Sequence, residues 1–326
     1  MRQQSQRPQH PVRVRIDGQQ QQLHAKPPES GPVSAAEVHR RHNAVSGTVN
    51  DNARAVRQNE RVRKLLISTV TVVVALALAA LAVDFGTSIY AEYRLSRTVR
   101  TAAHLDWDPS VAILGFPFIN QAVNRHFDEV EIKAYDVAHV QVERATLEAT
   151  MHNLDLAQAS WLVRPDAPIP VGKLESRIII DSRRLGGFLG VRDLMVEAPR
   201  AETNDATGGT TESGISGSVG LVFTGTPTAA GFDKRVSVSV DLSMDGPQDT
   251  TLVITPTGIL TEAGTADQSV PDDRLAEVLA AFAGRVPDQR LPFGVAPTTQ
   301  GARGSDVIIE GIVDDVTVKL TEFNPN

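Results

Sequence analysis

The feature that most constrains this chain of 326 residues is a run of 19 uncharged, mostly apolar residues from Leu65 to Val83. As a helix, with its rise of about 1.5 Å per residue, the run would be about 28 Å long. That length is close to the roughly 30 Å hydrocarbon thickness of a bilayer. A buried helix of a soluble protein would show polar positions facing water, and no polar residue larger than Thr interrupts this run. We therefore predict one transmembrane helix over residues 65–83.

Charge is distributed unequally on the two sides of the run. Five basic residues precede it closely, whereas the first basic residue after it is Arg94; the five are Arg54, Arg57, Arg61, Arg63 and Lys64. The positive-inside bias then places the N-terminus in the cytoplasm and the C-terminal region outside. The alternative is a secretory signal peptide cleaved at the alanine-rich end of the run, but 64 preceding residues favour an uncleaved anchor.

Residues 1–64 form a basic segment with few large apolar side chains. They carry 12 Lys and Arg against 5 Asp and Glu, and they are rich in Gln and Pro. Such a composition buries too little apolar surface to offset the entropy lost on ordering. We predict a disordered cytoplasmic tail whose charge favours the anionic inner leaflet.

Residues 84–326 form the predicted extracytoplasmic domain, and they are acidic, with 20 Lys and Arg against 34 Asp and Glu. This balance argues against nucleic acid as a partner. The chain has no cysteine, which excludes disulfides, thiolate metal sites and a cysteine nucleophile. A length of 243 residues is enough for a core without such cross-links.

The domain changes from helical to strand-like patterning at about residue 111. Residues 84–105 favour a short amphipathic helix with Ile89, Tyr93, Val99 and Ala103 near one face, and Asp108-Pro109 ends that pattern. The segments that follow alternate apolar and polar residues, which predicts antiparallel strands with one buried face. These segments are 111–118, 130–143, 145–152, 176–182, 214–224, 235–244, 250–255, 305–312 and 313–320.

Two later segments return to a helical pattern. Residues 182–190 place Leu185, Phe188 and Leu189 on one face, with Ser182 as the expected N-cap. Residues 271–284 show stronger periodicity, and their apolar positions are Leu275, Val278, Leu279 and Phe282. The sum is an α+β domain in which long amphipathic helices pack on a strongly curved antiparallel sheet.

Enzymatic motifs are weak in this sequence. It contains no phosphate-binding G-x-x-x-x-G-K-[ST] loop, no G-x-S-x-G elbow and no H-E-x-x-H pair. The carboxylate pair Asp106 and Asp108, and the neighbours His126 and Asp128, are better explained as solvated loop residues. We predict no enzyme activity, no cofactor and no metal site.

The most informative local motif is the apolar stretch from Ile113 to Ile119, which contains Gly115-Phe116-Pro117-Phe118. With residues 108–112 before it, Gln121 after it and Val130-Glu131-Ile132 beyond, this stretch resembles the opening of the actinobacterial LmeA-like phospholipid-binding family. Residues 291–295, 307–311 and 315–320 are similar to the last strands of that family. The resemblance covers roughly residues 84–326. It implies a fold of the tubular lipid-binding type, a membrane-attached periplasmic location and a role in cell-envelope lipid or lipoglycan assembly, with possible glycan-assembly proteins as partners.

An apolar groove between helix and sheet can hold acyl chains with few directional contacts, because burial gains about 0.8 kcal/mol per CH₂. The candidate lipid-binding side chains are the large apolar ones of the first strands and of the two later helices. They are Ile113, Phe116, Phe118, Val130, Ile132, Leu185, Phe188, Leu189, Leu275, Leu279 and Phe282. Each is also a good core residue. The headgroup phosphate would fall to cations such as Arg125, Lys133 or Arg183.

Two other functions remain open from the sequence. The domain can be a structural or interaction module that tethers envelope machinery and binds no small molecule. It can also be a glycan-processing enzyme with Asp106, Asp108 or Glu129 as the acid–base pair. The sequence leaves open which lipid is bound, whether it is cargo, and the oligomeric state.

Overall fold

The computed structural model describes residues 35–156, 164–199, 214–261 and 269–325, with side chains described from Glu60 onward. The chain divides into two compact units, Met1–Val74 and Ala75–Asn326. The second unit contains the end of the long helix α1 and both β-sheets of the protein. The predicted tail residues 1–34 lie outside the described residues.

Helix α1 (Ala35–Ala102) contains the predicted span and extends it in both directions. Residues 35–64, expected to be disordered, are helical. They contain no proline, and once a helix has formed, each added residue avoids the cost of nucleation. At the other end, the segment predicted as a separate helix continues α1 without a break, and His104 in a left-handed conformation follows its last turn. Glu60–Ala102 is long and apolar enough to cross a membrane.

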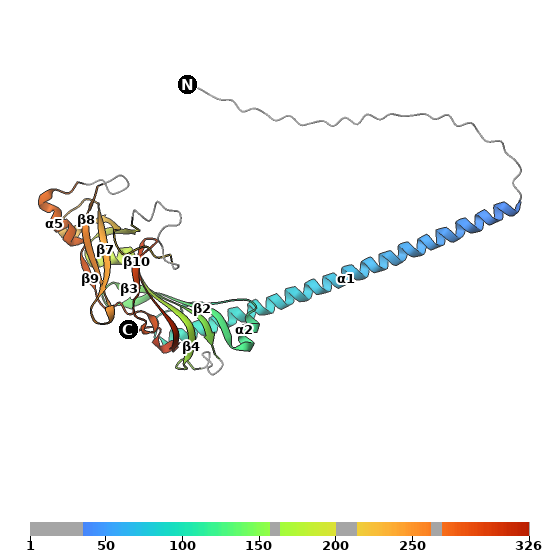
Figure 1. Ribbon diagram of the computed structural model, residues 1–326, viewed down its shortest axis with the longest axis horizontal. Helices are drawn as coiled ribbons and strands as arrows, with labels where there is room; N and C mark the ends of the chain where they lie inside the picture. The colour runs from blue at the N-terminus through green and yellow to red at the C-terminus, as the bar shows by residue number, and fades with distance from the viewer. Residues whose placement is uncertain (1–34, 157–163, 200–213, 262–268, 326) are drawn as a thin grey trace, which may run out of the picture. The chain divides into compact units, whose positions relative to one another are not determined.

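The first sheet, sheet A, is six-stranded and antiparallel. Its order is β1-β2-β3-β4-β11-β10. The bounds are β1 Ser110–Leu114, β2 His126–His139, β3 Glu143–Asp155, β4 Ile169–Ile180, β10 Thr299–Arg303 and β11 Asp306–Val318. The sheet is strongly curled (Figure 1). One cause is a register shift between β2 and β3 at Ala134 to Val137, where Asp136 has a positive φ of 52°, because a bulge increases local twist.

Sheet B is a five-stranded antiparallel sheet of order β5-β6-β7-β8-β9. The bounds are β5 Arg192–Glu197, β6 Leu221–Thr226, β7 Val236–Asp245, β8 Thr251–Leu260 and β9 Gly284–Val286. In β7 the apolar side of the predicted alternation is buried, since Val236, Val238 and Val240 are fully buried, but Ser237 on the polar side is fully buried as well. The predicted α+β class with a curved antiparallel sheet is confirmed. The strands form two sheets, because β5 to β9 pair among themselves while β11, with β10 beside it, pairs back onto β4.

Among the residues that the structure describes, three short α-helices accompany the sheets: α2 (Phe118–Asn124), α3 (Ser182–Leu189) and α5 (Leu275–Ala281). Helix α2 was not predicted from the sequence, and the strand predicted over residues 111–118 ends at Leu114. In α3 the N-cap is Asp181, whose side chain accepts from the Arg183 amide, rather than the predicted Ser182. The remaining 3₁₀ turns are η1 Thr228–Ala230, η2 Pro247–Asp249, η3 Asp272–Arg274, η4 Pro292–Gly294 and η5 Leu320–Glu322.

Candidate lipid-binding site

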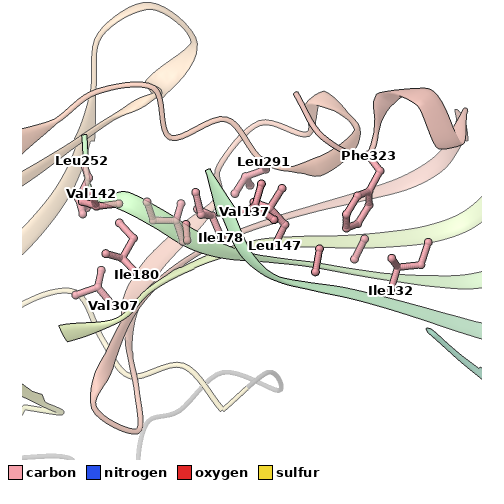
Figure 2. Close-up of a cluster of buried hydrophobic side chains, with 14 of the residues drawn as sticks. Ile132, Val137, Val142, Leu147, Ile178, Ile180, Leu252, Leu291, Val307 and Phe323 are labelled. Atoms are coloured by element: carbon pink, nitrogen blue, oxygen red, sulfur yellow. The ribbon is translucent and has the colours of Figure 1, made fainter. Parts of the chain in front are cut away.

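One face of sheet A is a continuous apolar surface (Figure 2). Strand alternation builds it, because every second residue of β2, β3 and β4 points to the same side. The strand register pairs apolar residues with apolar residues: Ile132 lies opposite Ala149, and Leu147 lies opposite Ile178. We call this the inner face of sheet A.

The end of α1 contributes the complementary surface. Ala91, Leu95 and Val99, with Ala103 directly after the last residue of α1, recur at every fourth position and so form one stripe. All four are buried in the same apolar cluster as the inner face. The predicted stripe differs in its first half, because Ile89 and Tyr93 are 64% and 54% exposed. The buried stripe and the inner face together define the seam.

Hydrogen bonds attach α1 to the strands around the seam. Glu92 Oε1 accepts from the Ile113 amide at 3.0 Å, and Ser96 Oγ donates to the Pro109 carbonyl at 2.6 Å. Near the C-terminus, Asn324 Nδ2 donates to the Ala103 carbonyl at 3.2 Å. These contacts fix which face of α1 meets sheet A.

The seam is closed in this structure. Val99, Ile132 and Ala149 have no surface accessible to a water-sized sphere. Side chains lining an open slot wide enough for an acyl chain would retain accessible surface. A lipid tail can therefore enter at these positions only if α1 and sheet A move apart.

Comparison with known families identifies the domain. The sequence model described as LmeA-like phospholipid-binding matches residues 82–312, which is most of the chain and includes the inner face of sheet A and the buried stripe of α1. The chain belongs to this phospholipid-binding family. No curated protein matches the chain, and no solved structure does.

Membership of the LmeA-like family confirms the resemblance seen in the sequence and supports phospholipid binding. The matched region begins at Ala82, at the end of the predicted span. The family is a lipid-binding one, which makes the apolar surfaces the first place to look for its site.

The structure distributes the predicted lipid-binding residues over two surfaces. Those from the first strands meet on sheet A: Ile113 lies opposite Val130, and the rings of Phe118 and Phe127 are 6.1 Å apart. Those from the later helices meet on sheet B, since α3 contacts β5 and α5 contacts β8. The candidates therefore lie on both sheets, and the buried ones among them belong to one hydrophobic cluster.

Burial divides the same residues differently. Seven are buried, namely Ile113, Phe118, Val130, Ile132, Leu185, Leu189 and Phe282. Phe188 and Leu279 are partly buried, whereas Phe116 and Leu275 are 63% and 38% exposed. Their roles as lipid contacts stay predictions.

The three candidate headgroup cations lie apart. Arg125 is exposed at the C-terminal end of α2. Lys133 forms an ion pair with Glu148 and lies 5.3 Å from the Tyr135 ring centre. Arg183 lines a pocket of about 420 Å³ together with Arg144 and Arg184. This pocket also contains Thr146 and Ile179, which strand alternation places on the face opposite the seam.

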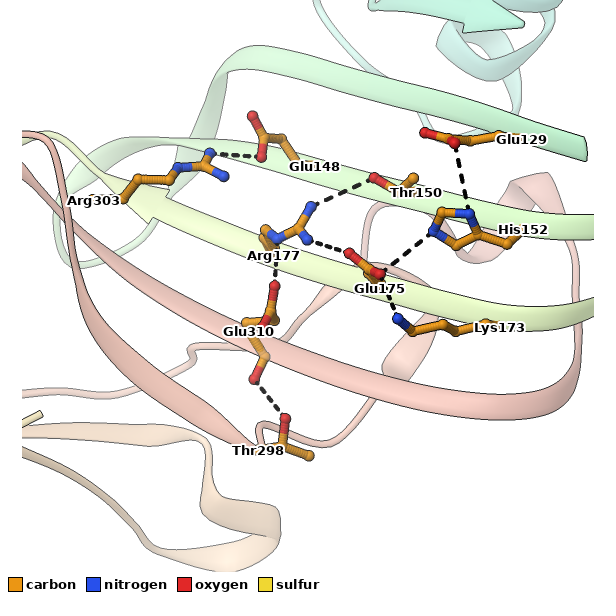
Figure 3. Close-up of polar contacts among 10 residues, drawn as sticks. All are labelled: Glu129, Glu148, Thr150, His152, Lys173, Glu175, Arg177, Thr298, Arg303 and Glu310. Carbon is orange, nitrogen blue, oxygen red and sulfur yellow. Dashed lines mark hydrogen bonds and ion pairs between the residues drawn. The ribbon is translucent and has the colours of Figure 1, made fainter. Parts of the chain in front are cut away.

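That opposite face carries a buried charge network (Figure 3). Arg303 Nη2 lies 2.8 Å from Glu148 Oε2, and Arg177 Nε lies 2.6 Å from Glu310 Oε2. Arg177 also pairs with Glu175. The side chains of Glu148 and Glu310 are only 4% and 1% exposed, so their partners are needed to offset the cost of desolvation.

The network sets the protonation of its carboxylates. Burial alone would raise the pKa of Glu148, but the hydrogen bonds and positive charges of Lys133 and Arg303 outweigh it and hold that pKa below its ordinary value. Glu175 behaves likewise, with burial opposed by Lys173 and Arg177. Both groups are therefore held as carboxylates by their cations.

The candidate acid–base residues have structural partners. Asp108 Oδ1 lies 3.3 Å from Arg100 Nη1, and Asp106 Oδ2 lies 3.5 Å from Arg144 Nη1. Glu129 Oε2 lies 3.7 Å from His152 Nδ1. Within the described parts of the chain, no group of three or more His, Asp or Glu side chains is placed to bind a metal ion.

Two polar residues with local roles were missed by the sequence analysis. The carboxylate of Asp84 is 5% exposed and accepts from the amides of Phe118 and Ile119, at 3.0 and 2.9 Å. Gln121 accepts from the Asp128 amide at 2.9 Å and donates to the Leu114 carbonyl at 3.3 Å. The position of Asp84 directly after the apolar run could have indicated its role from the sequence. No sequence pattern indicated the role of Gln121.

Proposed function

We propose that this protein is a membrane-anchored, extracytoplasmic phospholipid-binding protein that acts without catalysis. The observation that carries the proposal is the family match, which includes the strands and the helix that form the seam. In this proposal, acyl chains occupy the seam after the buried stripe of α1 separates from sheet A. The hydrogen bonds at Glu92 and Ser96 would act as the closure that a lipid must open.

Anchoring would be supplied by residues 65–83 in α1. Their apolar side chains are exposed, so they have no protein core to occupy, and lipid is the environment that suits them. The basic residues before the span support a cytoplasmic N-terminus and an extracytoplasmic domain. The resemblance suggests work in cell-envelope lipid or lipoglycan assembly, with glycan-assembly proteins as candidate partners.

The closed seam favours a second candidate, an interaction module that tethers envelope machinery without a small-molecule ligand. Fully buried Val99, Ile132 and Ala149 are what a permanent core would show. The two candidates differ in whether lipid tails ever reach the inner face of sheet A.

A photo-crosslinking experiment separates them. The full chain is placed in nanodiscs that contain a phospholipid with a diazirine on its acyl chain, and adducts are mapped by peptide mass spectrometry. Adducts at residues 65–83 act as the internal positive control. Lipid binding predicts further adducts in β2 and β3, whereas the interaction module predicts adducts at the span alone.

A matched pair of variants sharpens the result. Ala149→Phe fills the inner face, and overpacking of this kind costs about 1–3 kcal/mol. It should remove the adducts in β2 and β3. Ala138→Phe adds the same ring at an exposed position of β2 and should leave them unchanged. Equal adduct yields in both variants would argue against the seam as the site.

A further inference from the structure

Helix α2 presents two of its apolar residues, Ile119 and Val123, to the outside. Ile119 and Val123 are one turn apart, so they share a face, and they are 40% and 75% exposed. The opposite face buries Phe118 together with the polar Gln121. A helix built to lie in water would do the reverse, burying Ile and Val and exposing Gln.

Exposed apolar residues continue around this helix. Phe116, in the turn before α2, is 63% exposed, and Phe85 on α1 is 58% exposed. Their rings are stacked with centres 6.2 Å apart. Leu114, at the end of β1, is 44% exposed. We call Phe85, Leu114, Phe116, Ile119 and Val123 the apolar foot.

The apolar foot lies directly beside the end of the predicted span. Phe85 follows Val83 by two residues, a rise of about 3 Å along the helix. The Asp84 carboxylate, between them, holds the first two amides of α2. The residues from Ala75 onward belong to the same compact unit as the foot. With residues 65–83 in a bilayer, α2 therefore lies at the level of the lipid headgroups.

Polar groups around the foot match that level. Tyr90 and Tyr93 are exposed on α1 one to two turns beyond Phe85, and such rings are enriched at membrane interfaces. Exposed Arg125 closes α2, where a cation would meet lipid phosphates. A protein partner would have to bind at Phe85, which is only two residues after the end of the predicted span. With the span in a bilayer, lipid is already adjacent to that residue.

We propose that the apolar foot is a membrane-docking surface that inserts into the boundary between headgroups and acyl chains of the leaflet facing the domain. This inference rests on the proposed anchoring by residues 65–83. It gives α2 a function that the family match does not specify, which is to hold the β1 end of sheet A against the leaflet that supplies lipid.

The absence of cysteine makes this directly measurable, because one introduced cysteine is the only labelling site. The full chain carrying F116C or V123C is labelled with the fluorophore NBD. It is then reconstituted in vesicles of phosphatidylcholine and phosphatidylglycerol with doxyl quenchers at shallow or deep acyl positions. V140C is the matched control, since Val140 is 81% exposed in the turn beyond β2, roughly 40 Å of strand away from α2.

The proposal predicts strong quenching of labels at 116 and 123 by the shallow quencher, at least threefold above that at 140. Quenching at 116 and 123 equal to that at 140 would overturn it. The melting temperature of each labelled protein is compared with that of the unlabelled chain to verify folding. A Val123→Asp substitution in the F116C chain should lower the quenching at 116 without changing the melting temperature.

L78C reports separately on the anchoring. A label at 78 that is quenched by the deep lipid, with 116 and 123 unquenched, overturns the docking surface and leaves anchoring intact. Quenching at 116 and 123 without quenching at 78 supports docking and overturns anchoring instead.

Discussion

Helices α2 and α3 are nearly equal in length and differ in which side chains they bury. Helix α3 buries Leu185 and Leu189 against sheet B and leaves Arg183 exposed, as expected for a helix between a core and water. Helix α2 buries Gln121 and exposes Ile119 and Val123. The difference indicates that α2 faces a medium less polar than water. The predictions below test this contrast, from the largest expected effect to the smallest.

Leu185→Ala should destabilise the protein by about 2–5 kcal/mol, because it leaves a cavity at a fully buried position. Val123→Ala should change stability by no more than about 0.5 kcal/mol, since the side chain is exposed. Chemical denaturation of the detergent-solubilised full chain measures both. A similar loss in both variants would mean that α2 packs against protein and would break the comparison.

Asp84→Asn should cost about 1.5–3 kcal/mol, because the buried carboxylate accepts two amide hydrogen bonds and the amide side chain offers one acceptor. Asp181→Asn in α3 is the matched cap. It should cost little, since Asn is an equally good N-cap and the Asp181 side chain is 40% exposed. Hydrogen exchange at the Ile119 and Arg183 amides reports each cap. Faster exchange at Arg183 alone would contradict the prediction.

Gln121→Leu should destabilise by about 1–3 kcal/mol despite raising hydrophobicity, because the Asp128 amide and the Leu114 carbonyl lose their partner. Asn124→Leu, on the exposed end of the same helix, is the control and should be near neutral. The melting temperatures of the two variants decide the matter. A stabilised Gln121→Leu protein would show that α2 packs as an ordinary amphipathic helix.

Acidification should weaken sheet A in two stages. Burial lowers the pKa of His139 despite the hydrogen bond to the Asp288 carbonyl, so stability begins to fall below histidine's ordinary pKa of about 6.5. The lowered pKa values of Glu148 and Glu175 give stability that is complete above about pH 4.3 and is lost as the pH falls through the folded-state values.

Melting curves of Glu148→Gln from pH 7.5 to 3.5 test the second stage. The variant should be less stable than the native protein at pH 7.5 but should lose less of its free energy of unfolding on acidification. The two slopes should differ by at most about 1.4 kcal/mol per pH unit, the limit for one titrating group. Glu143→Gln, with an 87% exposed side chain, should follow the native protein. If the Glu148→Gln protein lost stability as steeply as the native protein on acidification, protonation of Glu148 would not be a cause of the acid sensitivity.

Much of sheets A and B follows from local pattern. Alternation in β2, β3 and β7 is visible in the sequence because each strand has one apolar and one polar side. Helix α2 was missed because it is short and its apolar residues do not share one face: Ile119 and Val123 are exposed, whereas Phe118 is buried beside the polar Gln121. The N-cap of α3 was misplaced by one residue because Asp181 and Ser182 are both good caps.

The sequence by itself determined the apolar run, most of the longer strands and the family, because these depend on apolar periodicity and on motifs contiguous in the chain. It predicted no strand at β5, β9 or β10. Tertiary structure alone decided that Asp84 holds α2, that Arg177 and Glu310 form an ion pair, and that the strand and helix candidates separate onto two sheets. The physical reason is distance along the chain. Hydrogen bonds and ion pairs join residues 34 to 133 positions apart, and strand pairing, which no local pattern encodes, brings them together.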